Sequence, residues 1–277
     1  MPKRVGRCAL TGEQGSFIKS HLLPRALTPP RSGGTPFPQI GSGKRPVKRL
    51  DSWYDLELVT KAGEDILTAY DTYAINELRR LKLVWQSWGP MLSLSTSDYG
   101  VFPAEPYGLR LVRFSDVGRM RRFLLSLLWR AVATSLPEFS EIQVSASNLR
   151  RLRRYVRDGD DPPVDFFPAT LTQLADRGPS HNLGPLAQVK PGVQLGSVRT
   201  RDLPIFRFYF DGLIVHFHRD VGPEDIAGME PFIVGAREAT TISTVRSASS
   251  WELKNLALCI DDALRMYPDA LGRAGGL

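Results

Sequence analysis

His21 is the residue of the N-terminal region whose type and position best suit catalysis. It follows a turn that begins at Cys8 and a short extended segment, and it precedes a bend at Pro24. An imidazole can take a proton from water near neutral pH, because its ordinary pKa is about 6.5. His21 is therefore a candidate for acid–base chemistry. The alternative is a structural histidine at the end of a strand.

Two carboxylates, Glu64 and Asp71, lie seven residues apart in a segment with helical periodicity from Lys61 to about Trp85. This spacing is about two helical turns, so both side chains should lie on roughly the same face. Carboxylate oxygens suit a hard divalent cation such as Mg²⁺ or Mn²⁺. Glu64 and Asp71 are therefore candidate ligands for such an ion. Alternatively, Glu64 complements the helix dipole and Asp71 has a surface role.

The turn at Cys8 followed by His21 resembles the opening of the HNH-type endonuclease module. In that family a cysteine turn precedes a strand that ends in the catalytic histidine. Residues 54–74 also resemble a turn that opens a helix in bacterial HNH-like proteins of about this length, and residues 123–135 resemble the central helix of those proteins. The resemblance covers residues 8 to about 160, and it implies an N-terminal ββα unit.

The family resemblance implies a divergent, metal-dependent nuclease that acts on nucleic acid, with DNA favoured, and that uses Mg²⁺ or Mn²⁺. It implies that His21 is the general base on a water molecule, and that Glu64 and Asp71 hold the metal ion that stabilises the leaving oxygen. Such proteins are associated with prophages and phage-defence genes. Ser20 stands where the family often has a carboxylate next to the histidine. This departure leaves a second possibility, a catalytically inactive HNH-like scaffold that binds nucleic acid or a partner protein of a defence complex.

The family also holds a structural zinc ion with two Cys-x-x-Cys pairs. Here the first turn carries Cys8 and Thr11, and the second turn carries Thr60 and Gly63. A tetrahedral zinc site needs four ligands, and one thiolate cannot replace them. We therefore expect no structural zinc, and we expect packing or hydrogen bonds from the two threonines to hold the turns. Cys8 should be a buried thiol.

Two clusters of basic residues predict contacts with phosphate groups. The first lies in a loop rich in glycine and proline and consists of Lys44, Arg45, Lys48 and Arg49. The second lies on a helix expected from Ser147 and consists of Arg150, Arg151, Arg153, Arg154 and Arg157. Like charges this close repel one another unless an anion is near; the alternative is a solvated helix docked on the core. The net charge of +7 also favours a polyanionic partner.

The elements that must position these residues predict an α+β protein. We expect an HNH-like domain over residues 1–90 and a mixed domain over residues 91–277. The second domain should contain a buried helix over 119–136 and a hairpin over 205–218, which Asp211-Gly212 joins. A closing amphipathic helix is expected over 251–267.

The composition of the chain predicts its cellular compartment. The chain has 277 residues, of which 42% are hydrophobic and 23% are charged, as in a soluble globular protein. Only Cys8 and Cys259 are present, which fits a reducing compartment. The first residues lack the apolar core of a signal peptide, and the most apolar run is too short and polar to span a bilayer. We expect a cytoplasmic protein without a membrane partner.

Overall fold

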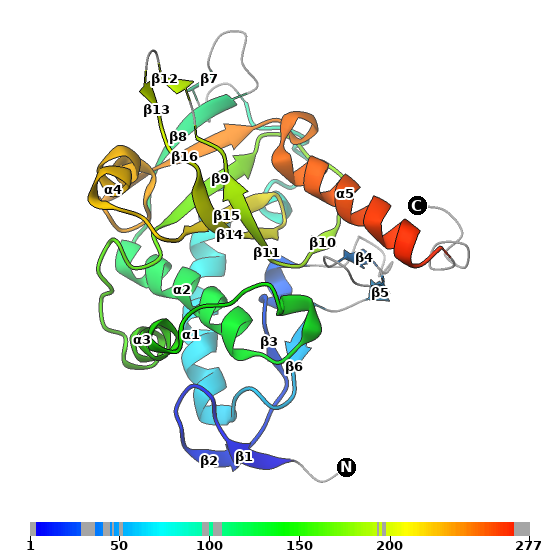
Figure 1. Cartoon of the computed structure of the whole chain (residues 1–277), viewed down its shortest axis with the longest axis vertical. Coiled ribbons are helices and arrows are strands. Elements are labelled where there is room, and N and C mark those ends of the chain that lie inside the picture. The colour runs from blue at the N-terminus through cyan, green and yellow to red at the C-terminus, as the bar shows by residue number, and fades with distance from the viewer. Residues whose placement is uncertain are drawn as a thin grey trace.

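The computed structural model describes residues 4–28, 37–40, 45, 47–49, 52–95, 100–101, 107–192, 194–195 and 198–268. In this part of the chain, strands form one large sheet in the order β11–β14–β15–β9–β16–β8–β7 (Figure 1). β9 and β16 run parallel, and every other neighbouring pair is antiparallel. In sheet order the strands are Leu186–Lys190, Leu203–Phe210, Leu213–His218, Ala169–Leu174, Ala239–Val245, Tyr107–Arg113 and Gly100–Val101.

The hairpin predicted over residues 205–218 is formed by β14 and β15. Asp211 and Gly212 make its two-residue turn, with φ of 49° and 85°. Positive φ at both positions gives the turn a twist that matches the flanking strands. Because side chains alternate along a strand, Phe206 and Phe208 point to the same side of the sheet, and both are fully buried in the core.

Three helices contribute to the core on that side of the sheet. They are α1 (Lys61–Arg80), α2 (Val117–Ala133) and α3 (Ala146–Asp158). Buried residues of these helices and of β14, β15 and β9 belong to one hydrophobic cluster. Helices packed on a mixed sheet confirm the α+β class predicted from the sequence.

The boundaries of α2 differ slightly from the predicted range of 119–136. The helix begins at Val117, because the side chain of Asp116 accepts a hydrogen bond from the backbone N–H of Arg119 and caps the first turn. It ends at Ala133, where the chain becomes extended. Most of the helix is buried, as the apolar run predicted.

Two predictions near α1 were wrong in detail. The helix expected to reach about Trp85 ends at Arg80, because Lys82 has a φ of 52° and turns the chain away. Leu56, Leu58 and Val59 suggest a short strand in the sequence, but the chain bends at residues 56–58, and the extended pair lies just before the bend, as β6 at Tyr54–Asp55.

The opposite side of the sheet carries two further helices, α4 (Pro223–Met229) and α5 (Trp251–Met266) (Figure 1). α5 confirms the closing helix predicted over 251–267. Its N-terminus is capped by Ser250, and Leu256 belongs to a second, smaller apolar cluster on this side.

Short elements complete the described chain. The remaining strands are β1 (Val5–Arg7), β2 (Gln14–Ser16), β3 (Ser20–His21), β4 (Phe37–Ile40), β5 (Val47–Arg49), β10 (Asn182–Leu183), β12 (Gln194–Leu195) and β13 (Val198–Arg199). The short 3-10 helices are Arg25–Leu27, Trp85–Ser87, Pro137–Phe139, Glu230–Phe232 and Ser247–Ser249.

The main core crosses the boundary that the sequence suggested at residue 90. Leu10 and Leu67 lie in the same cluster as Leu124 and Phe208. This shared core does not support a division into units of residues 1–90 and 91–277, and that division stays a prediction. Among the helices that the structure describes, none has the length and apolar character to cross a membrane.

Candidate functional site

The turns at Cys8–Thr11 and Thr60–Gly63 meet around the thiol of Cys8, a residue that is 1% exposed. The backbone N–H of Thr11 lies 3.4 Å from Sγ and donates to it. Burial alone would raise the pKa of the Cys8 thiol, but hydrogen bonds from Thr11 and Thr60 outweigh it and lower that pKa. On the helix side, a Cβ added to Gly63 would stand 2.7 Å from Sγ. Hydrogen bonds and close packing thus join the four positions.

His21 lies on β3, which pairs with β6 so that His21 is opposite Tyr54. The two rings meet edge to face, with centroids 6.1 Å apart. The imidazole is partly exposed. The carbonyl oxygen of His21 accepts a hydrogen bond of 3.2 Å from Nη1 of Arg130, so α2 fixes the backbone at this position.

Glu64 lies in the first turn of α1 and faces the same strand. The Ser20 hydroxyl donates a hydrogen bond of 2.6 Å to Oε2 of Glu64. Burial raises the pKa of Glu64; the Ser20 hydrogen bond and the charges of Arg130 and His21 oppose this effect, and the charge of Asp71 adds to it. Of the three predicted residues, His21 and Asp71 therefore both lie within electrostatic reach of Glu64.

Asp71 is held by a residue that the sequence did not suggest, Arg130 of α2. Nη2 and Nη1 of Arg130 donate to the two carboxylate oxygens of Asp71 at 2.6 and 3.0 Å. The side chains of Arg130 and Asp71 are 1% and 19% exposed. Such a bidentate pair is strong because both charges lie away from bulk water and the guanidinium fork matches the carboxylate.

This donor set does not fit a divalent cation. Both oxygens of Asp71 already bond to a guanidinium, whose fixed positive charge repels a metal ion. In the described ranges, no group of three or more His, Cys, Asp or Glu side chains could hold a metal ion. The role predicted for Glu64 and Asp71 as metal ligands therefore stays a prediction, and this geometry does not support it.

The arginine-rich helix α3 is present as predicted, with Ser145 as its N-cap. Arg150, Arg151, Arg154 and Arg157 are exposed. Some of these charges are partly compensated, since Arg157 pairs with the adjacent Asp158 and Arg154 lies 3.8 Å from Asp160. Arg151 stacks over the ring of Phe166, 4.2 Å from its centroid.

Arg153 reaches from α3 to the first turn, and this contact was not predicted. Its Nε donates to the Leu10 carbonyl at 2.7 Å. Arg7 of β1 approaches the same turn and donates from Nε to the Gly12 carbonyl at 2.8 Å. Nη2 of Arg153 and Nη2 of Arg7 lie 2.6 and 3.7 Å from the point where a Gly12 Cβ would stand. In the described chain, neither arginine has an ion pair with a carboxylate.

The first predicted basic cluster is described only in part. Arg45 is exposed. Lys48 and Arg49 lie in β5, which pairs with β4, and their side chains lie outside the described structure, as does all of Lys44.

His216 and His218, whose spacing is superficially that of a metal motif, lie on one face of β15 with ring centroids 6.4 Å apart. Nε2 of His218 is 3.0 Å from the Thr170 hydroxyl. Burial and the charge of Lys190 lower the pKa of His218 to about 4, so its ring is neutral at physiological pH.

Comparison of the chain with protein-family models, with curated proteins and with solved structures found no match, so the residue geometry alone carries the functional argument.

Proposed function

We propose that this protein binds nucleic acid through a basic surface formed by α3 and the first turn, on an HNH-like scaffold that does not cleave with a metal ion. The observation that carries this proposal is the approach of Arg7 and Arg153 to one point beside Gly12. They come from separate elements, and backbone carbonyls orient both guanidinium groups. A phosphate group is the ligand that such a geometry suits.

The energetics favour an anionic partner. Two guanidinium groups held this close repel each other, and a phosphate placed between them would convert the repulsion into two charge-assisted hydrogen bonds. The exposed arginines along α3 would extend the contact to neighbouring phosphates. Affinity of this kind depends little on base sequence and falls as salt rises, because binding releases counterions from the nucleic acid.

The ion pair between Arg130 and Asp71 supports the non-catalytic part of the proposal. It occupies the carboxylate that the resemblance would assign to a metal ion. Two features support the HNH-like part of the proposal. The two turns meet at Cys8, and β3, β6 and α1 follow one another along the chain.

Binding is tested by fluorescence anisotropy with a short labelled DNA duplex and with an RNA duplex, between about 50 and 200 mM salt. We expect the double variant Arg7→Gln/Arg153→Gln to weaken binding and to reduce the slope of log K against log salt by about 2, or about 1 per lost contact. Arg246→Gln is the control, because Arg246 is exposed and lies outside this surface. Equal salt slopes in the double variant, the control and the parent protein would contradict the proposed surface.

A divergent nuclease is the second candidate, and the proximity of His21 to Glu64 favours it. The test is incubation with supercoiled plasmid and either Mg²⁺ or Mn²⁺, beside a His21→Ala variant. We expect the plasmid to stay intact with both proteins. Nicking that is lost in His21→Ala would replace the proposal with the nuclease. A stable co-purifying protein together with no DNA binding would instead favour a scaffold for a partner protein.

A further inference from the structure

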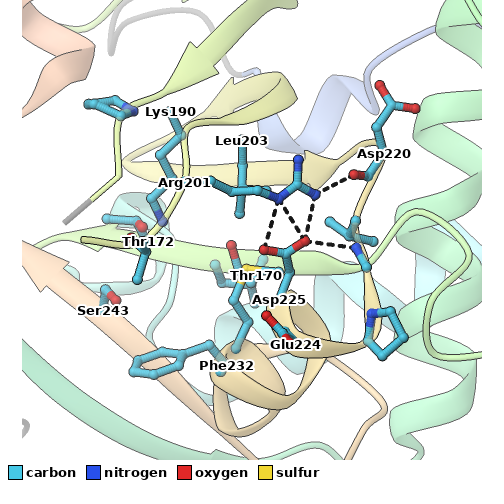
Figure 2. A pocket seen from close by; sticks show the side chains of 18 residues that line it. Thr170, Thr172, Lys190, Arg201, Leu203, Asp220, Glu224, Asp225, Phe232 and Ser243 are labelled. Atoms are coloured by element: carbon cyan, nitrogen blue, oxygen red, sulfur yellow. Dashed lines mark hydrogen bonds and ion pairs between the residues drawn. The ribbon is translucent and has the colours of Figure 1, made fainter. Parts of the chain in front are cut away.

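A cleft of about 1270 Å³ lies on the side of the main sheet opposite the helical core, between the sheet and α4 (Figure 2). Its floor is formed by β9 and β16, and β11 and β14 form one wall. None of the residues with predicted functions lines it. The cleft is large enough for a small organic molecule, since such sites usually measure a few hundred to about 1,000 Å³.

The floor of the cleft is polar. Thr170 and Thr172 project from β9 on the same face of the strand, and the register places Ser243 of β16 beside Thr172. Thr172 and Ser243 are partly exposed, and their hydroxyls have no hydrogen-bond partner among the described residues. The other face of the same strands is apolar, with Leu171 and Ile242 buried in the core. The hydroxyls are therefore available to a ligand.

Lys190, the last residue of β11, supplies a positive charge inside the cleft (Figure 2). It makes no ion pair with a described carboxylate, whereas the other cation of the cleft, Arg201, is bound to Asp225 at 2.5 Å. Although Lys190 stays open to solvent, the surrounding walls lower the pKa of its amine by removing water from it. Burial lowers the pKa of both His216 and His218, and the charge of Lys190 adds to this effect, so the two rings are neutral and supply no counter-charge.

The remaining residues around the cleft indicate the polarity and charge of the rest of the ligand. Met229 and Phe232 present partly exposed apolar surface on the α4 side, and Leu203 does so from β14. At the rim, Asp220 and Glu224 are exposed and would repel a second negative group. A molecule with one anionic end and an uncharged, largely apolar body matches this distribution.

We propose that this cleft binds a small amphipathic organic anion. Its acidic group pairs with Lys190, the hydroxyls of Thr172 and Ser243 hold its polar atoms, and its body packs on Leu203 and Phe232. A carboxylate and a phosphate ester share this chemistry, and the experiment separates them. The proposal is independent of nucleic-acid binding on α3, because the cleft and that surface share no residue.

The probe is 8-anilinonaphthalene-1-sulfonate, an aromatic anion whose fluorescence rises when it leaves water. We expect one binding site, and we expect Lys190→Met to weaken binding at least tenfold while Lys190→Arg retains it. Lys254→Met is the matched control, because Lys254 lies on α5 over the ring of Trp251, outside the cleft. Displacement by octanoate would identify a carboxylate ligand, and displacement by adenosine 5′-monophosphate would identify a phosphate ester.

The uncharged analogue N-phenyl-1-naphthylamine separates charge recognition from general apolar binding. We expect it to bind much more weakly than the sulfonate and to be insensitive to Lys190→Met. Thermal unfolding followed by circular dichroism checks that each variant is folded. The proposal is wrong if the sulfonate does not bind, if Lys190→Met binds it as tightly as the parent protein, or if the uncharged analogue binds equally well.

Discussion

At the scale of single residues, Arg130 changes the interpretation of the candidate site. In the sequence it only interrupts the apolar run of a helix. Its partner Asp71 lies 59 positions earlier, and pattern within a window cannot reveal a pair that tertiary packing creates. The proximity of Glu64 and Asp71 could be predicted from helical spacing. What the spacing could not predict is that α2 would insert a guanidinium beside them.

The Arg130–Asp71 ion pair leads to a prediction about the stability of the protein. Asp71→Asn removes the carboxylate that pairs with the buried Arg130 guanidinium. We expect it to lower the free energy of unfolding by about 3 kcal/mol, at the low end for a broken buried pair, because Asp71 is partly exposed and Glu64 lies near the guanidinium. Urea denaturation measures this. The control is Asp65→Asn on the same helix, where the exposed pair with Lys61 contributes less than about 1 kcal/mol. A similar decrease in the free energy of unfolding in both variants would show that burial of Arg130 does not increase the cost of losing its ion pair.

At the scale of elements, local signals predicted the hairpin and the helices well. Asp211-Gly212 identified the turn, and the periodicity of 251–267 identified α5. The order of strands was not predictable, because the parallel pairing of β9 with β16 joins segments far apart in sequence. The cleft floor depends on that register, which brings Ser243 beside Thr172. The polar floor of the cleft could therefore not be predicted from the sequence.

The hairpin turn makes a prediction about pH. Burial raises the pKa of Asp211 from 3.8 to about 6. The folded state therefore disfavours the charged carboxylate, so the stability that this group contributes is complete below pH 4 and is lost as pH rises through about 6. Asn keeps the acceptor for the backbone N–H of Gln86 and tolerates positive φ, but it carries no charge. We expect Asp211→Asn to stabilise the protein above pH 7 by up to about 3 kcal/mol relative to its effect at pH 4.

The measurement for Asp211 is the difference in unfolding free energy between variant and parent at several pH values from 4 to 8. Asp220→Asn is a matched control, because Asp220 also has a positive φ, of 52°, but its side chain is exposed. The Asp220→Asn difference is the baseline for removing an exposed carboxylate at a similar backbone conformation. The same pH profile for Asp211→Asn and for this baseline would contradict the burial argument.

The two turns around Cys8 give a prediction that tests the family resemblance. The triple variant Thr11→Cys/Thr60→Cys/Gly63→Cys would place four thiols at positions that already converge, and four thiolates bind zinc tetrahedrally. We expect one zinc ion per chain by elemental analysis and a higher melting temperature with zinc than after chelation. Gly63→Cys alone should destabilise the protein, because its Cβ would press on the Cys8 sulfur. A folded triple variant that binds no zinc would remove the structural support for an HNH-like knuckle.

At the scale of the whole molecule, the contacts between the N-terminal segment and the rest are extensive. Tyr70 Oη donates to the Val156 carbonyl at 3.2 Å, and Tyr73 Oη donates to the Asp116 carbonyl at 2.7 Å. With the Arg130–Asp71 pair, these bonds tie α1 to α2 and α3. Composition and turn signals could suggest a boundary near residue 90, since Trp88-Gly89-Pro90 ends an element. They could not show that the apolar face of α1 has its partner in the following segment.

Because α1 buries its apolar face against later helices, residues 1–90 alone should not fold. Without α2, residues such as Leu67, Ala74 and Leu78, now at most 1% exposed, would face water. We expect a fragment of residues 1–90 to give a poorly dispersed NMR spectrum and no cooperative thermal transition, and we expect the full chain to unfold in one transition seen alike by near- and far-ultraviolet circular dichroism. The full chain measured under the same conditions is the control. A fragment that melts cooperatively would establish an independent N-terminal domain, and Arg130 would then be an interdomain contact rather than part of one core.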